Sequence, residues 1–326
     1  MNIEVIGLGA LNMDHLYRVD RILNDGETVA EEVLSTPGGS AANTIYGLAR
    51  LSVSTGFIGA VGDDTDGKLL VEDFQKAGVD TSRIKVKRSA RSGFVLCLSD
   101  RRGKRSLYVN PGANNLLTND DIDLHYVNQS NMLHVTSFAN DRQFQLTREL
   151  VAKLDSTVKL SFSPGMLYAT RGLEALAPIL ERTYALFLNH AELRQLTGEE
   201  HVVAGVERLR QGCQIIVVTL GKGQTLKRDK GRRAVNTVAY IRDTSGEYVI
   251  EPGRQGIATV ADTTGAGDAF ATGFLYGLLN GKGPEECGRL GNIVAQFCIT
   301  KLGARTGLPA RSELAQRYYE LYQQEL

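Results

Sequence analysis

The sequence has few cysteines and no long apolar segment. The four cysteines form no Cys-x-x-Cys pair, which argues against a zinc site and against a disulfide framework; they are Cys97, Cys213, Cys287 and Cys298. No apolar run approaches the roughly 20 residues of a membrane span. The N-terminus lacks the basic and apolar regions of a signal peptide. We therefore expect a reducing, cytoplasmic location without membrane contact.

The sequence also has no surplus of either charge. Lysine plus arginine and aspartate plus glutamate number 37 each, so the global charge predicts neither a nucleic-acid partner nor an anionic membrane surface. A basic cluster within residues 227–233 is interpreted as a solvated hairpin. No GxxxxGK[ST] loop occurs, and Asn12 stands where the dinucleotide fingerprint needs its third glycine. These features exclude a Walker loop and a Rossmann cofactor site.

The distribution of apolar residues predicts an α/β protein. Hydrophobic residues make up 42% of the 326 residues, enough for a sizeable core. From residue 132 onward, short strands alternate with helix-periodic segments, which is typical of a doubly wound, mostly parallel sheet with helices on both faces. Strand-like pieces at about 14–36 and 90–112 flank polar turns and are predicted to form a separate small sheet. We expect one domain over residues 1–326 with this small sheet attached.

One stretch, Asp262-Thr-Thr-Gly-Ala-Gly-Asp-Ala-Phe270, carries a chemical signal. It lies between a β-branched segment at 257–261 and a helix-periodic segment from Ala269 to Leu279. Its small residues leave unpaired N–H groups in the first helical turn, where the helix dipole favours phosphate oxygens. Asp268 lies in the same turn, and a carboxylate there suits a base that deprotonates an attacking hydroxyl. A capped helix after a tight glycine turn is the structural alternative.

Two earlier segments carry groups suited to a small polar ligand. Asn12 and Asp14 follow the first predicted strand, at the edge where ligands gather in open α/β sheets. Gly38-Gly39-Ser-Ala-Ala-Asn43 opens a helix, and its glycines let a ligand approach the backbone. The amide of Asn43 can both donate to and accept from a hydroxyl. A plain loop leading into a helix is the structural alternative.

Asn189 and Glu192 follow a later strand at a spacing of three residues. They therefore share one face of the first helical turn, where they could hold a hydrated Mg²⁺. A capped helix with an exposed glutamate is the structural alternative.

The stretch at 262–270 and the segment from Gly38 to Gly67 resemble the two signatures of the ribokinase and phosphofructokinase-B family of sugar and nucleoside kinases, in the expected order. The resemblance implies a ribokinase-like fold in which the small sheet is a lid over the sugar site. It also implies a homodimer through this lid, for which unpaired edge strands give a physical reason. With ATP as donor, Asp268 would be the base, and the amides of Gly265, Ala266 and Gly267 would form the anion hole. The implied acceptor-binding residues are Asn12, Asp14, Gly38, Gly39 and Asn43.

Weaker motifs of the family extend the resemblance to the nucleotide and metal sites. Asn189-His-Ala-Glu192 matches an Asn-x-x-Glu metal motif, in which Glu192 would hold Mg²⁺ through water. Thr219-Leu-Gly-Lys-Gly223 resembles a nucleotide-side segment, with Gln224 in place of its last glycine. The implied ATP-binding residues are Asn189, Thr219, Gly221, Gly223, Thr264 and Asn292. Asp262 and Thr264 are the implied ligands of a monovalent cation such as K⁺, although Gly307 replaces a polar residue of that site.

The sequence therefore predicts an ATP-dependent kinase that phosphorylates a hydroxymethyl group of a small sugar or of the ribose of a nucleoside. Ribose, a nucleoside, fructose and 2-keto-3-deoxygluconate all stay open as acceptors. Asn12-x-Asp14 resembles ribokinase, whereas the segment at 38–44 looks closer to prokaryotic nucleoside kinases. A non-catalytic sugar- or nucleotide-binding regulator on this fold is the alternative from another class. The joint presence of Asp268, the anion hole and Glu192 speaks against a regulator.

Overall fold

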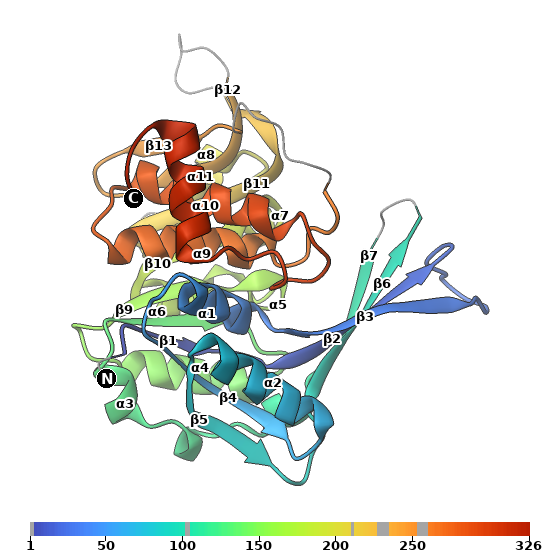
Figure 1. Ribbon diagram of the computed structural model, residues 1–326. Coiled ribbons are helices and arrows are strands. Elements are labelled where there is room, and N and C mark those ends of the chain that lie inside the picture. The colour runs from blue at the N-terminus through green and yellow to red at the C-terminus, as the bar shows by residue number, and fades with distance from the viewer. Residues whose placement is uncertain (1–2, 102–104, 210–211, 227–234, 253–259) are drawn as a thin grey trace.

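A nine-stranded sheet runs through the body of the computed structural model, which describes residues 3–101, 105–209, 212–226, 235–252 and 260–326 (Figure 1). The strands from β11 to β5 pair in parallel, and β12 and β13 extend one edge in antiparallel pairing. This arrangement confirms the predicted mostly parallel sheet. From edge to edge, the strands are β13 (Glu247–Ile250), β12 (Val235–Arg242), β11 (Ile215–Leu226), β10 (Thr183–Asn189), β9 (Lys159–Ser163), β8 (Met132–Thr136), β1 (Val5–Leu8), β4 (Thr55–Gly62) and β5 (Asp80–Lys87).

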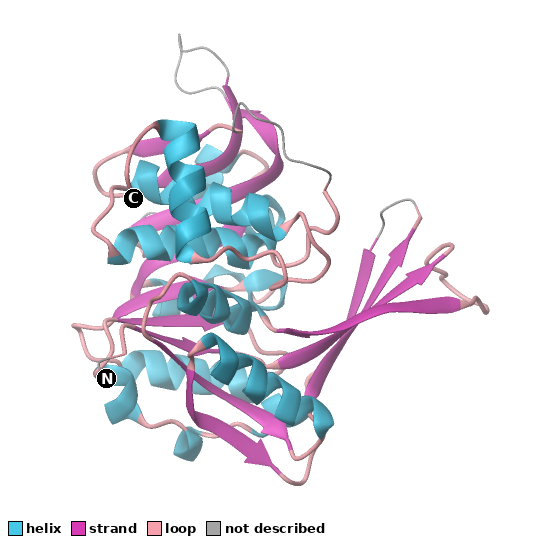
Figure 2. Cartoon of the chain, viewed as in Figure 1, coloured by secondary structure: helices cyan, strands magenta, loops and turns pink. Residues whose placement is uncertain are grey.

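Helices cover both faces of this sheet (Figure 2), because its strands carry buried apolar side chains on both sides. One layer contains α1 (Ser40–Arg50), α2 (Thr65–Ala77), α9 (Ala266–Leu279), α10 (Pro284–Cys298) and α11 (Arg311–Tyr322). The other contains α3 (Leu124–Asn128), α4 (Asp141–Lys153), α5 (Gly165–Ala169), α6 (Gly172–Leu180), α7 (His190–Thr197) and α8 (Val202–Leu209). Two short 3₁₀ helices, η1 (Gly112–Leu116) and η2 (Asn119–Asp121), precede α3. No helix among the described residues has the length and apolar character needed to cross a membrane.

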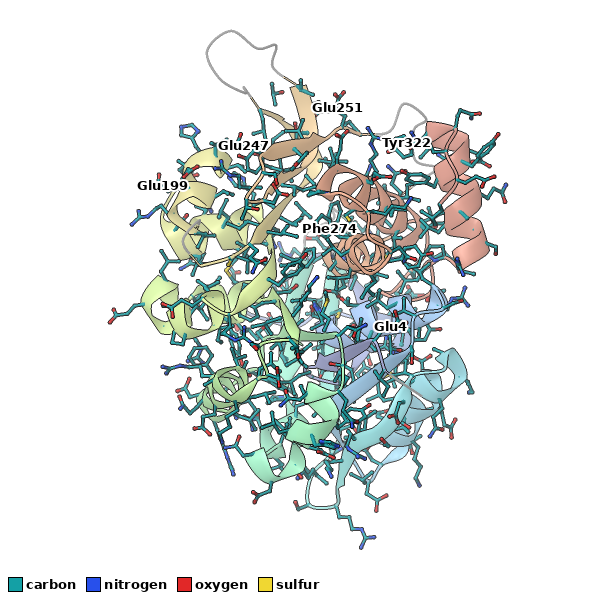
Figure 3. The ribbon with its side chains drawn as sticks, turned by 90° about the vertical axis from the view of Figure 1, so that its left-hand side faces the viewer. Glu4, Glu199, Glu247, Glu251, Phe274 and Tyr322 are labelled. Atoms are coloured by element: carbon teal, nitrogen blue, oxygen red, sulfur yellow. The ribbon has the colours of Figure 1, made fainter. Side chains whose placement is uncertain are left out.

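Helix α9 lies at the centre of its layer and packs against both α1 and α10. Nine of its residues are buried, so the helix is apolar almost all round, as a helix enclosed by neighbours must be. Phe274 is completely buried and contacts Phe187 of β10 edge to face, with ring centres 5.4 Å apart. Figure 3 shows Phe274 in the middle of the body. This packing fixes the position of the first turn of α9.

A second, small sheet projects from the body, as the sequence predicts (Figure 1). Its spatial order is β3 (Ala30–Gly38), β2 (Asn12–Val19), β6 (Gly93–Asp100) and β7 (Arg105–Asn110). The chain leaves the large sheet at Leu8 and enters the small sheet at Asn12. The first residues of β2 therefore lie where the two sheets meet, and so do the last residues of β3, because Asn12 pairs with Gly38.

The structure differs from the sequence-based expectation at β11. The pattern predicts that this strand ends at Leu220, but it continues to Leu226, with a shift in its register against β12 between Thr219 and Gln224. Gly221 and Gly223 lie in that irregularity with φ of 59° and 99°, so they let the strand bulge rather than terminate it.

Two other predicted segments fall largely outside the described residues. Of the strand expected at 257–261, only residues 260 and 261 are described, and they are not in a strand. The basic hairpin expected at 227–233 lies entirely outside the described residues.

Candidate active site

The candidate site lies where the N-termini of α1 and α9 meet. Each helix begins after a glycine in the left-handed region, Gly39 with φ of 102° and Gly265 with φ of 74°. A side chain at Gly39 would strike the carbonyl oxygen of Ala10, and one at Gly265 would strike Ala304. Both positions therefore require glycine. The positive ends of two helix dipoles are brought together as a result.

Asp268, in the first turn of α9, is held by two side chains of α1. Ser40 Oγ donates to its Oδ1 at 2.6 Å, and Asn43 Nδ2 donates to its Oδ2 at 2.8 Å. Burial raises the pKa of Asp268 to about 6, while the bonds from Ser40 and Asn43 and the charge of Arg305 act against the rise. A carboxylate with this pKa is ionised at neutral pH and is still basic enough to accept a proton during a reaction.

The backbone of the same turn offers N–H groups to an anion. The N–H of Ala266 makes a bond of 3.3 Å to the carbonyl of Thr263, but no acceptor among the described residues lies opposite the N–H groups of Gly265 and Gly267. Gly267 is exposed. Unpaired amides at the start of a helix bind phosphate oxygens and can stabilise the charge that develops during phosphoryl transfer.

Asp14 lies at the other end of the site, buried against Gly38. It is 7% exposed, and its Oδ1 has no hydrogen-bond partner among the described residues. A side chain at Gly38 would overlap this carboxylate, so only glycine allows the two chains to approach so closely. Burial raises the pKa of Asp14 to about 7, Arg305 opposes the rise, and Asp268 and Asp262 add to it. A buried oxygen without a partner can accept a hydrogen bond from a ligand hydroxyl.

Asn12 is oriented by a residue that the sequence analysis does not single out. Its Oδ1 accepts from Asn114 Nδ2 at 2.9 Å, and the same Asn114 also bonds the N–H and the carbonyl of Leu11. Asn114 lies in η1 and is almost completely buried. This bond fixes the orientation of the Asn12 amide, and its nitrogen can donate a hydrogen bond to the phosphoryl acceptor.

Arg305 is a second residue that the sequence analysis missed. Its guanidinium donates from Nε to Asn43 Oδ1 at 2.9 Å and from Nη2 to the carbonyl of Gly38 at 3.0 Å. Nη1 lies 2.6 Å from Asp73 Oδ2. The segment Gly-Ala-Arg-Thr-Gly has the composition of a loop, and loop arginines are normally exposed. The sequence therefore gives no signal that Arg305 is buried and bonded to the site. Ser40 was detectable, because it lies inside the glycine-rich segment at 38–43.

Asn189 and Glu192, which are predicted to hold a hydrated metal ion, form a capping box at the start of α7. Asn189 Oδ1 accepts from the N–H of Glu192, and Glu192 Oε2 accepts from the N–H of Asn189, both at 2.9 Å. Burial raises the pKa of Glu192 to about 7; the bond from Asn189 opposes this, and the charge of Asp268 adds to it. The described residues contain no group of three His, Cys, Asp or Glu side chains able to hold a metal ion.

The other residues predicted on the nucleotide side are spread over several elements. Thr219 pairs with Asn189 in the register of β10 and β11, and the two glycines of the β11 irregularity follow it. Asn292 lies on α10 and is only 9% exposed. Thr264 bonds Asp262 through both its N–H and its hydroxyl. No hydrogen bond links these groups into one cluster among the described residues.

Arg105 of β7 reaches from the small sheet to the loop before α9. Its Nη1 lies 2.6 Å from Asp262 Oδ1 and 2.6 Å from Thr264 Oγ1. The second oxygen of Asp262 accepts from the N–H of Gly303 at 3.0 Å. The two residues predicted to bind a monovalent cation thus already have a positively charged partner.

A cavity of about 300 Å³ separates the small sheet from the segment at 260–264. Its wall on the small sheet carries apolar side chains together with Arg18, Arg105 and Asp100. Asp262 lines the opposite side, so two arginines and two carboxylates face the cavity. The other residues that line the cavity include Leu16, Cys97, Leu107 and Thr263.

An α/β fold in which two helix N-termini meet beside a buried carboxylate is the arrangement expected of a kinase with an alcohol acceptor. The model of the pfkB family of carbohydrate kinases matches residues 2–311, and the chain belongs to that family. The chain is 38% identical to an uncharacterized sugar kinase of Archaeoglobus fulgidus, over 81% of this chain and 98% of that protein. It is 30% identical to an ATP-dependent ribose-1-phosphate kinase of Halopiger xanaduensis, over 93% of this chain and 94% of that one.

Solved structures agree with the predicted ribokinase-like fold. Arabidopsis thaliana ribokinase complexed with ribose and ATP superposes with a TM-score of 0.78 at 24% identity, over 97% of this chain and 98% of that one. The chain is accordingly an ATP-dependent kinase that transfers the γ-phosphoryl group to an alcohol group of a sugar or nucleoside.

Proposed function

We propose that Asp268 is the catalytic base of this kinase and that the acceptor lies between Asp268 and Asp14. The contacts that hold Asp268 beside the unpaired N–H groups of Gly265 and Gly267 carry this proposal. Asp268 accepts the hydroxyl proton as the hydroxyl oxygen bonds the γ-phosphorus, and the bond from that phosphorus to the bridging oxygen of ADP breaks. The amides of the turn neutralise the charge on the transferred group. The same contacts speak against a non-catalytic regulator, which needs no positioned base.

For the acceptor, we propose a small neutral sugar or a nucleoside, held by Asn12, Asp14 and Asn43. The unpartnered oxygen of Asp14 supports this, because it can accept a hydrogen bond from a sugar hydroxyl. An anionic sugar is the second candidate, because Arg18 lines the adjoining cavity; Arg105 lines it too but is already paired with Asp262. Arginine binds phosphate and carboxylate through paired N–H groups. The ribose-1-phosphate kinase among the relatives acts on such an acceptor according to its name.

The acceptor is tested by measuring ADP release with a panel of ribose, fructose, adenosine, 2-keto-3-deoxygluconate and ribose-1-phosphate. We expect one acceptor to exceed the others by at least tenfold in kcat/KM, because a missing hydroxyl leaves buried polar groups unpaired. A preference for either anionic acceptor would favour the second candidate. No ADP release with any of the five, in a protein that binds ATP, would contradict the proposed acceptor class.

We propose that the metal ion of the reaction is Mg²⁺ held near Glu192. One oxygen of Glu192 is used in the capping box and the other is available, which fits an ion that takes most of its ligands from water and phosphate. Bound Mg²⁺ would supply neutralising charge to the phosphate oxygens. Asn189 keeps Glu192 in place through the capping box.

Glu192→Gln should raise the Mg²⁺ concentration needed for half-maximal rate by about 10–100-fold, the usual effect of losing a partner that orients a metal ligand. Glutamine also completes a capping box, so α7 should stay folded. The control is Glu199→Gln, which removes an exposed carboxylate that pairs with Arg208. The measurement is the initial rate against Mg²⁺ at saturating ATP and acceptor. Equal Mg²⁺ dependence in both variants would remove Glu192 from the metal site.

We propose that Arg105 takes the place of a monovalent cation at Asp262 and Thr264. Its guanidinium contacts both residues, and the remaining oxygen of Asp262 is occupied by Gly303, so the residues fit K⁺ poorly.

We also propose that the small sheet is a lid and that its edge joins two copies into a homodimer. Exposed apolar side chains on the edge strand β7 support this, and light scattering measures it directly; they are Leu107, Tyr108 and Val109.

We propose a cytoplasmic location, on the basis of the unpaired cysteines. Fractionation of cells that produce the protein tests this.

A further inference from the structure

Arg305 is buried on the acceptor side of the site, although it comes from the loop after α10. Its side chain is 4% exposed, and its guanidinium carbon lies 5.0 Å from the ring centre of Phe74 and 5.3 Å from that of Tyr46. Removing a guanidinium from water is unfavourable unless its N–H groups are bonded. All three nitrogens of Arg305 make such bonds, and their partners are on three different elements.

The bond between Arg305 and Asn43 has a direction. The amide of Asn43 carries an acceptor oxygen and a donor nitrogen, which exchange places if the group flips. Arg305 can only donate, so its bond fixes the oxygen of Asn43 on its own side and turns the nitrogen toward Asp268. In the flipped amide, two acceptor oxygens would face each other at Asp268. Arg305 therefore decides which group Asn43 presents to Asp268.

A second bond of Arg305 acts on the other end of the site. It holds the carbonyl of Gly38, the residue against which the carboxylate of Asp14 is packed. The ion pair with Asp73 anchors the guanidinium on α2. The loop after α10 is thus tied to both ends of the acceptor site.

We infer that Arg305 is a positioning residue for phosphoryl transfer, which acts by orienting the amide of Asn43 toward Asp268. The inference rests on the proposed role of Asp268 as base. The positive charge of Arg305 also favours the ionised carboxylate of Asp268, because it opposes the rise in the pKa of Asp268 that burial causes. The other titratable groups that interact electrostatically with Asp268 are Asp14, Glu192 and Cys298.

The test is Arg305→Met, which keeps most of the buried volume but removes the charge and every donor. We expect kcat to fall on the order of 10²-fold, the effect of a small misplacement of reacting groups. We also expect the acidic limb of the kcat profile to move to higher pH, because the charge that opposed the rise in the pKa of Asp268 is gone. A packing defect alone would lower stability without moving this limb.

Three comparisons separate positioning from a merely structural role. Asp73→Asn removes the anchor on α2 but leaves the bonds to Asn43 and Gly38, so its acidic limb should stay in place or move to lower pH. In a double-mutant cycle with Asn43→Ala, the Arg305 substitution should cause little further loss, because its effect passes through Asn43. Arg305→Lys restores a charge and at most part of the bonding, so its kcat should lie between those of wild type and Arg305→Met.

Three kinetic outcomes overturn the inference: an unchanged pH profile and kcat in folded Arg305→Met, full additivity with Asn43→Ala, or the same pH shift in Asp73→Asn. If Arg305→Met does not fold, Arg305→Lys replaces it in the cycle. A ¹³C NMR titration of the Asp268 carboxyl carbon in wild type and variant needs no turnover. A wild type without kinase activity would contradict the proposed function, and an unchanged titration would contradict the inference by itself.

Discussion

The Asp268→Asn variant is expected to lose about 10²–10⁴-fold in kcat while it still binds ATP and the acceptor. An alcohol is a poor nucleophile while it keeps its proton, and asparagine cannot accept that proton. The fold should survive, because the hydroxyl of Ser40 can accept from the new amide nitrogen while Asn43 continues to donate to the amide oxygen. The N–H groups of Gly265 and Gly267 are untouched, so phosphate binding should persist.

The measurements for this prediction are kcat at saturating substrates and calorimetry of each ligand. In wild type, kcat should fall as the pH drops through about 6, where the base becomes protonated. A variant that folds, binds both ligands and keeps the wild-type kcat would show that Asp268 is not the base. Loss of ATP binding would instead place Asp268 in nucleotide recognition.

The Asp14→Asn variant is expected to bind the acceptor about 10–100-fold more weakly, with ATP binding unchanged. A hydrogen bond to a charged group is worth about 1.5–3 kcal/mol, and 1.4 kcal/mol corresponds to tenfold in affinity. Asparagine has the same shape, so it fits against Gly38 and isolates the effect of charge. The pKa of Asp14 is raised to about 7, so acceptor affinity of wild type should weaken as the pH falls below 7. The variant should lose this pH dependence.

The stability of the Asp14→Asn variant gives an independent check. The Asp14 carboxyl has an ordinary pKa of 3.8 when it is exposed to water in the unfolded chain and a pKa of about 7 when folded, so the folded protein holds its proton more tightly. That contribution to the free energy of unfolding is fully present below pH 3.8 and is lost as the pH rises through 7. In urea unfolding, the free energy of unfolding of the variant should therefore increase relative to that of wild type between pH 5 and pH 8. A constant difference would mean that Asp14 is not desolvated.

The sequence predicts those parts of the site that depend on short local patterns. Glycines before two helices are visible in the sequence because the backbone there requires φ values that other residues avoid, and Asp268 and Asn43 follow them at fixed spacings. The alternation of strands and helices likewise predicts the sheet, and the structure confirms it.

Contacts between segments far apart in the chain could not be predicted in this way. Arg305 and Asn43 are separated by 262 positions, and no local pattern distinguishes a buried loop arginine from a solvated one. The continuation of β11 beyond Leu220 depends on pairing with β12, so a reading of the strand by itself ends it at the glycines. Asn114 is similar, since its bonds to Asn12 and Leu11 arise only where η1 meets the start of β2.

The bond between Arg105 and Asp262 would couple the position of the small sheet to the charge of the loop before α9. A diffusible ion at Asp262 would come and go with its concentration in the medium, whereas a guanidinium tethered to β7 has a local concentration set by the chain. If the small sheet swings away to admit the acceptor, its positive charge leaves Asp262 with it. The negative charge of Asp262, at the start of the loop that leads to Asp268, would then be neutralised by Arg105 only while the small sheet is closed over the site. Entry of the acceptor and neutralisation of the Asp262 charge would thus alternate within each turnover, without a bound K⁺ ion.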